Sequence, residues 1–107
     1  MKAIFVREHG GPDVLVVEDT SVPSPGKGEV LVRIEAAGVN PVDTYIREGR
    51  HASTPPLPFV PGKDASGTVA ELGEGAEKFE KGARVYLAGS LTGTYAEYTV
   101  CREDQAW

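Results

Sequence analysis

The chain has 107 residues, 40% of them hydrophobic, and this length predicts a single domain with a core of its own. Eleven basic and sixteen acidic side chains give a net charge of −5, which argues against nucleic acid or an anionic membrane as the main partner. The first apolar run ends at Arg7, far short of a secretory signal or the ~20 apolar residues of a membrane span. We therefore expect a soluble cytoplasmic protein.

Side chains that bind soft metals are scarce. Cys101 is the single cysteine, so no internal disulfide can form, and His9 and His51 are the only histidines. The simplest interpretation of Cys101 is a free thiol in a reducing compartment.

Thirteen glycines and eight prolines divide the chain into short runs rich in β-branched residues, a pattern typical of an all-β domain. Residues 2–6 and 14–18 are predicted strands, joined by a turn at residues 10–13 into a hairpin. The clearest strand is predicted over residues 29–36, where Val30, Val32, Ile34 and Ala36 share one side. Leu31 alone breaks this alternation.

One short helix is predicted over residues 41–48. Asn40 is a favourable N-cap and Pro41 suits the first helical position, and Gly49 ends the segment. Val42, Tyr45 and Ile46 fall on one face of this helix.

Residues 49–62 contain four prolines, which remove backbone donors, so this stretch is predicted to be an irregular loop. Three further strands are predicted after it, at residues 65–72, 84–88 and 95–100. No internal repeat or domain linker interrupts the chain.

Two segments, residues 36–45 (AAGVNPVDTY) and 61–69 (PGKDASGTV), resemble the medium-chain dehydrogenase/reductase superfamily. Further blocks that resemble it follow the same order: residues 25–32 (PGKGEVLV), 81–85 (KGARV) and 93–98 (GTYAEY). Zinc-dependent members carry a ligand cysteine at the place of Asn40 and a ligand histidine at Lys63. An amide and an ammonium group cannot replace those ligands. The chain is therefore similar to the zinc-free branch, the quinone oxidoreductases of the zeta-crystallin type.

The lobe that holds a structural zinc in zinc dehydrogenases is also missing. In those relatives four closely spaced cysteines follow the Gly-x-Arg-Val strand, whereas here nine residues without a cysteine lead from Val85 to Tyr95. We therefore expect no zinc and no other metal site.

The resemblance implies a mainly β fold, a GroES-like partly open β-barrel with one or two short helices. Residues 1–107 would form the GroES-like catalytic (substrate) domain of the enzyme. The Rossmann dinucleotide-binding domain of the family is absent from this chain, because no glycines fit the G-x-G-x-x-G fingerprint. We expect the chain to be the N-terminal domain of a larger enzyme, inactive in isolation.

The resemblance also implies a reaction and its residues. The expected activity is NAD(P)H-dependent reduction of quinones or α,β-unsaturated carbonyls by hydride transfer without zinc, in a full-length homodimer. Asn40 and Tyr45 match positions that line the interdomain cleft beside the nicotinamide, so we expect them to be the catalytic and cofactor-binding residues. Weaker candidates for substrate contact are His51, Lys63 and Asp64. The absent domain recognises the ribose 2′ position of the cofactor, so this sequence does not predict the choice between NADPH and NADH.

Several less specific interpretations remain open. Asn40 could be only a helix cap and Tyr45 only a core residue. Asp43 and Asp64 invite a paired-carboxylate site, but Asp43 sits in the first helical turn, where its charge favours the helix dipole. The fold also suits a non-enzymatic binding module such as the GroES co-chaperonin, or a structural, crystallin-type protein. The prolines of residues 49–62 are a poor match to the mobile loop of a co-chaperonin.

Overall fold

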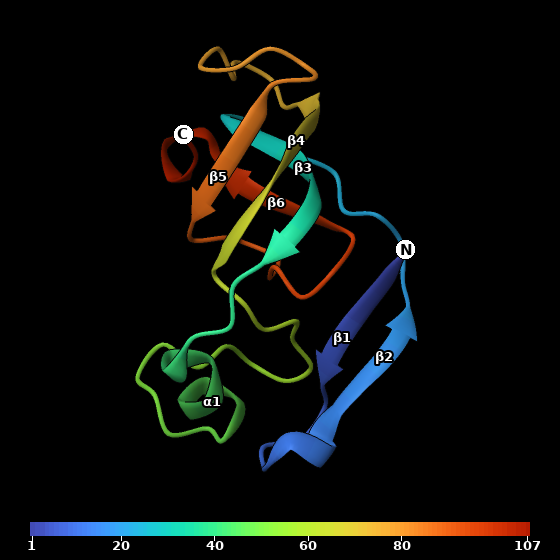
Figure 1. The fold of residues 1–107 in the computed structure, drawn as a ribbon, viewed down its shortest axis with the longest axis vertical. Helices are drawn as coiled ribbons and strands as arrows, with labels where there is room; N and C mark the ends of the chain where they lie inside the picture. The colour runs from blue at the N-terminus through green and yellow to red at the C-terminus, as the bar shows by residue number, and fades with distance from the viewer.

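The computed structural model describes residues 1–107, which form two antiparallel sheets and one α-helix (Figure 1). The strands of the two-stranded sheet are β1 (Lys2–Val6) and β2 (Leu15–Asp19). The four-stranded sheet has the order β5-β4-β3-β6, with β3 (Glu29–Ala37), β4 (Asp64–Leu72), β5 (Arg84–Ala88) and β6 (Tyr98–Arg102). The helical segments are α1 (Pro41–Arg47) and two 3-10 turns, Pro12–Val14 and Glu103–Gln105. This arrangement confirms the predicted mainly β, partly open barrel.

The N-terminal hairpin is confirmed. β2 pairs with β1 in register from Lys2 opposite Asp19 to Val6 opposite Leu15. The second strand begins one residue later than predicted because the turn includes the 3-10 segment Pro12–Val14.

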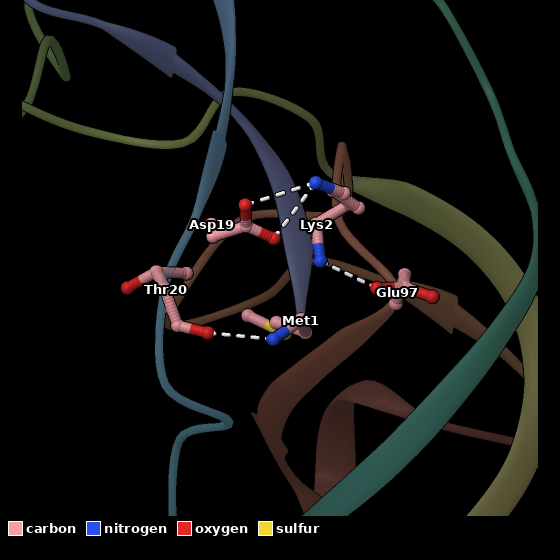
Figure 2. Close-up of polar contacts among 5 residues, drawn as sticks. All are labelled: Met1, Lys2, Asp19, Thr20 and Glu97. Atoms are coloured by element: carbon pink, nitrogen blue, oxygen red, sulfur yellow. Dashed lines mark hydrogen bonds and ion pairs between the residues drawn. The ribbon is translucent and has the colours of Figure 1, made fainter.

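Charged groups secure the open end of the hairpin (Figure 2). The N-terminal ammonium of Met1 donates to the carbonyl oxygen of Thr20 at 2.6 Å, and Lys2 Nζ lies 2.9 Å from the carboxylate of Asp19. The backbone N–H of Lys2 donates to the carboxylate of Glu97, a residue far away in the sequence. The hairpin is thus attached to the segment that precedes β6.

β3 is an interior strand, flanked by β4 and β6. Val30 and Val32 of the predicted common side are buried, but Leu31 is also only 3% exposed and Ala36 is exposed. Alternation fails because the β3–β4 pairing shifts register between Leu31 and Val32 and again between Ile34 and Ala36. The predicted alternation therefore fails at the C-terminal end of the strand as well as at Leu31.

The last predicted strand, residues 95–100, is displaced in the structure to Tyr98–Arg102. Tyr95 and Glu97 pair with the other sheet instead. The N–H of Ile4 donates to the carbonyl of Tyr95 at 2.8 Å, and the N–H of Glu97 donates to the carbonyl of Lys2 at 3.1 Å. Residues 95–97 therefore join the two sheets before the chain enters β6.

The core has two parts. The larger cluster fills the four-stranded sheet and consists of Val30, Val32, Ala65, Val69, Val85, Leu87, Cys101 and Ala106. The smaller cluster of Val6, Ile46 and Phe59 connects the hairpin, α1 and the proline-containing loop. Cys101 is fully buried, and this burial, reinforced by the charges of Asp104 and Glu29, raises the pKa of its thiol to about 11.

The α-helix α1 has seven residues, and no helical segment reaches the length and hydrophobicity of a membrane-spanning helix.

Residues 49–62 form the predicted irregular loop, which wraps around α1 (Figure 1) and is held to β1 by paired backbone hydrogen bonds between Phe59 and Val6. The loop ends at Gly62, where φ is +103° and a Cβ would lie 2.2 Å from Thr94 Oγ1. The N–H groups of Thr94 and Tyr95 both donate to the carbonyl of Pro61 at 3.0 Å. Only glycine fits this close approach of two chain segments.

We predict that Gly62→Ala destabilises the domain much more than Gly75→Ala. Both glycines have positive φ, but at Gly75, with φ of +74°, a Cβ would have no other atom within 4 Å. Gly75→Ala should cost about 1–2 kcal/mol of backbone strain. Gly62→Ala should cost about 1–3 kcal/mol more, because Thr94 must also move. Urea unfolding of both variants measures the difference, and equal losses would show that the contact with Thr94 is unimportant.

Candidate functional site

The N-terminus of α1 brings Asn40, Asp43 and Asp64 together. Asn40 is the N-cap, with extended backbone angles (φ −120°, ψ 154°), and Pro41 occupies the first turn as predicted. The backbone N–H of Asn40 donates to Asp43 Oδ2 at 2.9 Å, the carboxylate half of a capping box. The local sequence thus fixes the first turn by a bond from residue 40 to residue 43.

The side chain of Asn40 connects α1 to the larger sheet. Its Nδ2 donates to Asp64 Oδ2 at 2.7 Å, and Asp64 is the first residue of β4. The neighbouring N–H of Gly38 donates to the carbonyl of Asp64 at 2.8 Å. The structure therefore brings Asn40 and Asp64 together, two candidates that are 24 positions apart in the sequence.

Asp43 lies in the first turn, as predicted, but it is only 4% exposed. Its Oδ2 also accepts the hydroxyl of Tyr95 at 3.1 Å, whereas Oδ1 is buried without a hydrogen-bond partner. Asp43 and Asp64 do not pair with each other; each bonds instead to a different group of Asn40. The idea of a paired-carboxylate site finds no support in this geometry.

Tyr95 is the residue that sequence reasoning missed. It lies at the start of the predicted strand 95–100, and no sequence signal could link it to Asp43 across 52 positions. Burial, the nearby charge of Asp43 and the hydrogen bond to it raise the pKa of Tyr95 to about 12, against a smaller lowering by Arg47. The Tyr95 hydroxyl therefore stays protonated at neutral pH and donates its hydrogen bond to Asp43.

Tyr45 lies on the exposed side of α1. It is 47% exposed, with the guanidinium of Arg50 5.8 Å from its ring centroid, whereas Ile46 is buried. The alternative that Tyr45 is only a core residue is therefore wrong. An exposed ring and hydroxyl remain accessible to a bound molecule.

The other two candidates have no direct link to Asn40. His51 Nδ1 accepts the N–H of Ser53 at 3.0 Å, a contact within the loop. Lys63 is half-buried and forms no ion pair, so it does not pair with Asp64 or Asp43. Lys63 is held instead through its backbone, since its carbonyl accepts the N–H of Gly89 at 2.7 Å.

A cavity of about 680 Å³ lies between the hairpin, the end of β3, α1 and residues 94–97. Its apolar lining includes Leu15, Val17, Ile34 and Val39. Asp43, Arg47 and Tyr95 also border it, but Asn40 and Tyr45 do not. The predicted site residues therefore lie outside this cavity.

The donor set of the site does not suit a metal. No three side chains of histidine, cysteine, aspartate or glutamate converge on one point. Asn40 offers an amide and Lys63 an ammonium group at the two places where the resembled zinc enzymes have ligands.

The family model for the alcohol dehydrogenase GroES-like domain matches residues 26–107. Among curated proteins, the quinone oxidoreductase of Sus scrofa is 44% identical over 108 residues, covering 100% of this chain and 33% of that protein. The Homo sapiens quinone oxidoreductase is 43% identical over 104 residues, covering 96% of this chain and 32% of the human protein. The structure of Escherichia coli quinone oxidoreductase complexed with NADPH superimposes with a TM-score of 0.94 at 35% identity, covering 100% of this chain and 32% of that one.

The chain belongs to the alcohol dehydrogenase GroES-like domain family, within the medium-chain dehydrogenase/reductase superfamily that its motifs resemble. It spans about a third of the length of the relatives it matches.

We predict that Tyr95 ionises well above the ordinary tyrosine pKa of about 10. Its neutral form is favoured by folding, so its contribution to stability is complete below the unfolded pKa of about 10 and is lost as pH rises towards about 12. Tyr95→Phe should remove a tyrosine transition near pH 12 from an ultraviolet titration. Asp43→Asn should lower it, because a negative charge beside the phenol disappears.

The unchanged protein and Tyr95→Phe can also be compared by their stability. Between pH 10 and pH 12 the unchanged protein should lose more unfolding free energy than Tyr95→Phe, and Cys101 titrates equally in both. Identical pH dependences would contradict the raised pKa of Tyr95.

Proposed function

We propose that this chain is the substrate-side domain of a reductase that transfers hydride from NADPH or NADH to a quinone or an α,β-unsaturated carbonyl without zinc. The observation that carries the proposal is Asn40, which stands at the place of a zinc ligand and is held by Asp64 and Asp43. The similarity of the chain to proteins named quinone oxidoreductase, one of them solved with NADPH, supports the substrate class and the cofactor.

The residues present fit one part of a nicotinamide site. The amide of Asn40 can donate and accept hydrogen bonds, and the exposed Tyr45 offers a ring wall and a hydroxyl. No segment offers a glycine-rich cradle for the cofactor phosphates. We therefore assign phosphate and ribose binding to a Rossmann domain of a longer parent protein.

The proposed chemistry follows from the donor set. The nicotinamide cofactor, when bound, supplies a hydride and leaves oxidised. Reduction of an isolated carbonyl forms an alkoxide, a charge that zinc stabilises by several kcal/mol. A quinone or enone instead delocalises the charge over its own conjugated system. The protein then has to orient the acceptor and supply one proton.

Two tyrosines differ in their suitability as the proton donor. Tyr95 is bonded to Asp43, and its pKa of about 12 makes it a poor proton donor at neutral pH. Tyr45 is exposed on α1, so its hydroxyl or a water molecule is the donor we propose. His51 and Lys63 remain weaker candidates for contact with the acceptor.

The co-chaperonin alternative receives less support. Its partner-binding loop has to be mobile, whereas residues 49–62 contain four prolines and are bonded to β1 through Phe59 and Val6.

The resemblance to quinone oxidoreductases further supports a homodimeric, cytoplasmic parent enzyme.

We expect the longer parent protein to reduce a simple benzoquinone with NADPH, and the 107-residue chain alone to be folded but inactive. The reason is that the chain holds the substrate wall and lacks a dinucleotide fold. Stopped-flow assays measure quinone reduction by the parent, and fluorescence titration with NADPH measures cofactor binding by the chain alone. Tight NADPH binding by the chain alone would mean that the cofactor site has been misplaced.

We also predict that neither the chain nor its parent holds zinc at a stoichiometric level, because Asn40 and Lys63 occupy the ligand places. Elemental analysis of protein purified without chelator, beside a zinc alcohol dehydrogenase as a positive control, measures this. One tightly held zinc per chain would overturn the assignment to the zinc-free branch.

In the parent, Asn40→Ala and Tyr45→Phe should impair quinone reduction more than they impair folding. Asn40→Ala should cost the stability of a helix cap, about 1 kcal/mol, together with alignment of the cofactor. Tyr45→Phe removes only an exposed hydroxyl, so its melting temperature should barely change. Unchanged kinetic constants in both variants, or losses that unfolding explains, would show that Asn40 acts only as a helix cap and that Tyr45 is only an exposed surface residue.

A further inference from the structure

We propose that Asp43 is a positioning residue of this site, which acts through Asn40 and is itself held by Tyr95. This inference rests on the proposed function, in which Asn40 meets the nicotinamide side of the cofactor. Asp43 is 4% exposed and bonds to protein groups, so it is not itself offered as a group that touches substrate.

The carboxylate of Asp43 is costly to bury. Such a group is tolerated only where donors replace its lost water. Here Oδ2 accepts both available bonds, from the Asn40 N–H at 2.9 Å and the Tyr95 hydroxyl at 3.1 Å, while Oδ1 has no partner. Two donors must therefore meet at a single oxygen, and movement of either one weakens the solvation of the same charge.

This convergence restrains Asn40 from two sides. Its backbone is held by Asp43, and its side-chain amide is held by Asp64 at 2.7 Å. The direction of the amide therefore depends on where both carboxylates are fixed. Asp64 is fixed by its place at the start of β4, whereas Asp43 depends on the first turn of α1 and on Tyr95.

Tyr95 supplies the external anchor. Its backbone carbonyl accepts the N–H of Ile4 in β1, and its own N–H donates to the carbonyl of Pro61. A residue bonded to both β1 and the end of the proline-containing loop resists displacement. Through the Tyr95 hydroxyl, the N-terminus of α1 is attached to the hairpin sheet, and through Asn40 it is attached to the larger sheet.

The coupling can be measured in the 107-residue chain by NMR, without any reaction. In Tyr95→Phe the backbone amide of Asn40 should exchange with solvent about tenfold faster or more, and its side-chain amide resonances should shift, because the Asp43 carboxylate loses one of two donors. Tyr98→Phe is the matched control, since no hydrogen bond links its hydroxyl to a carboxylate. Unchanged exchange and resonances of Asn40 in Tyr95→Phe would overturn the coupling.

The role in the reaction is measured in the longer reductase by a double-mutant cycle. Tyr95→Phe should lower kcat with little change in the KM for the quinone, and this loss should disappear when Asn40 is already alanine. A purely structural role would give additive losses that follow the melting temperature, which would overturn the positioning role. Absence of quinone reduction in the unmutated parent would overturn the proposed function instead, while amide exchange in the chain still decides the coupling.

Discussion

The pairing of residues 95–97 with β1 is the constraint on which the arrangement of this domain depends. The hairpin shares no strand ladder with the larger sheet, and Tyr95 and Glu97 supply backbone bonds to Ile4 and Lys2. The chain enters β6 directly afterwards, so the same segment continues into the larger sheet beside β3. Without those bonds, the small cluster around Phe59 would still hold the hairpin to α1 and the proline-containing loop, but it includes no residue of the larger sheet.

The same segment also determines the surroundings of α1. A seven-residue helix is too short to be stable by itself, so its position depends on neighbours. Ile46 packs into the smaller cluster, Asp43 bonds to Tyr95, and Asn40 bonds to Asp64. Each of the three contacts comes from a different part of the barrel, which explains how a brief helix can present Asn40 in a defined direction.

Much of the architecture could be predicted from local sequence. Proline at the first helical position and a following glycine gave the limits of α1 to within one residue, and β1 and β5 matched in full. Errors occurred where tertiary pairing overrides local pattern. Residues 95–97 look like the start of a strand, but the edge of β1 captures them, and register shifts in β3 interrupt its alternation.

The site was predictable only in part, for a related reason. Asn40 could be selected from its motif, but its bond to Asp64 depends on how β4 starts. Tyr95 carried no signal at all, because its partner is far away in sequence and the bond forms only once both sheets are assembled. The burial of Asp43 likewise had no local signal, because its partner Tyr95 approaches α1 from a segment 52 positions away.

The buried thiol on β6, the last strand in the order of the larger sheet, has a practical consequence. Cys101 pairs with Val30 of β3, has no exposed surface, and reacts as a thiolate only above ordinary pH because its pKa is about 11. A thiol reagent at neutral pH can therefore modify it only in molecules whose β3–β6 ladder has opened. With one cysteine in the chain, the modification rate reports that opening directly, and no engineered label is required.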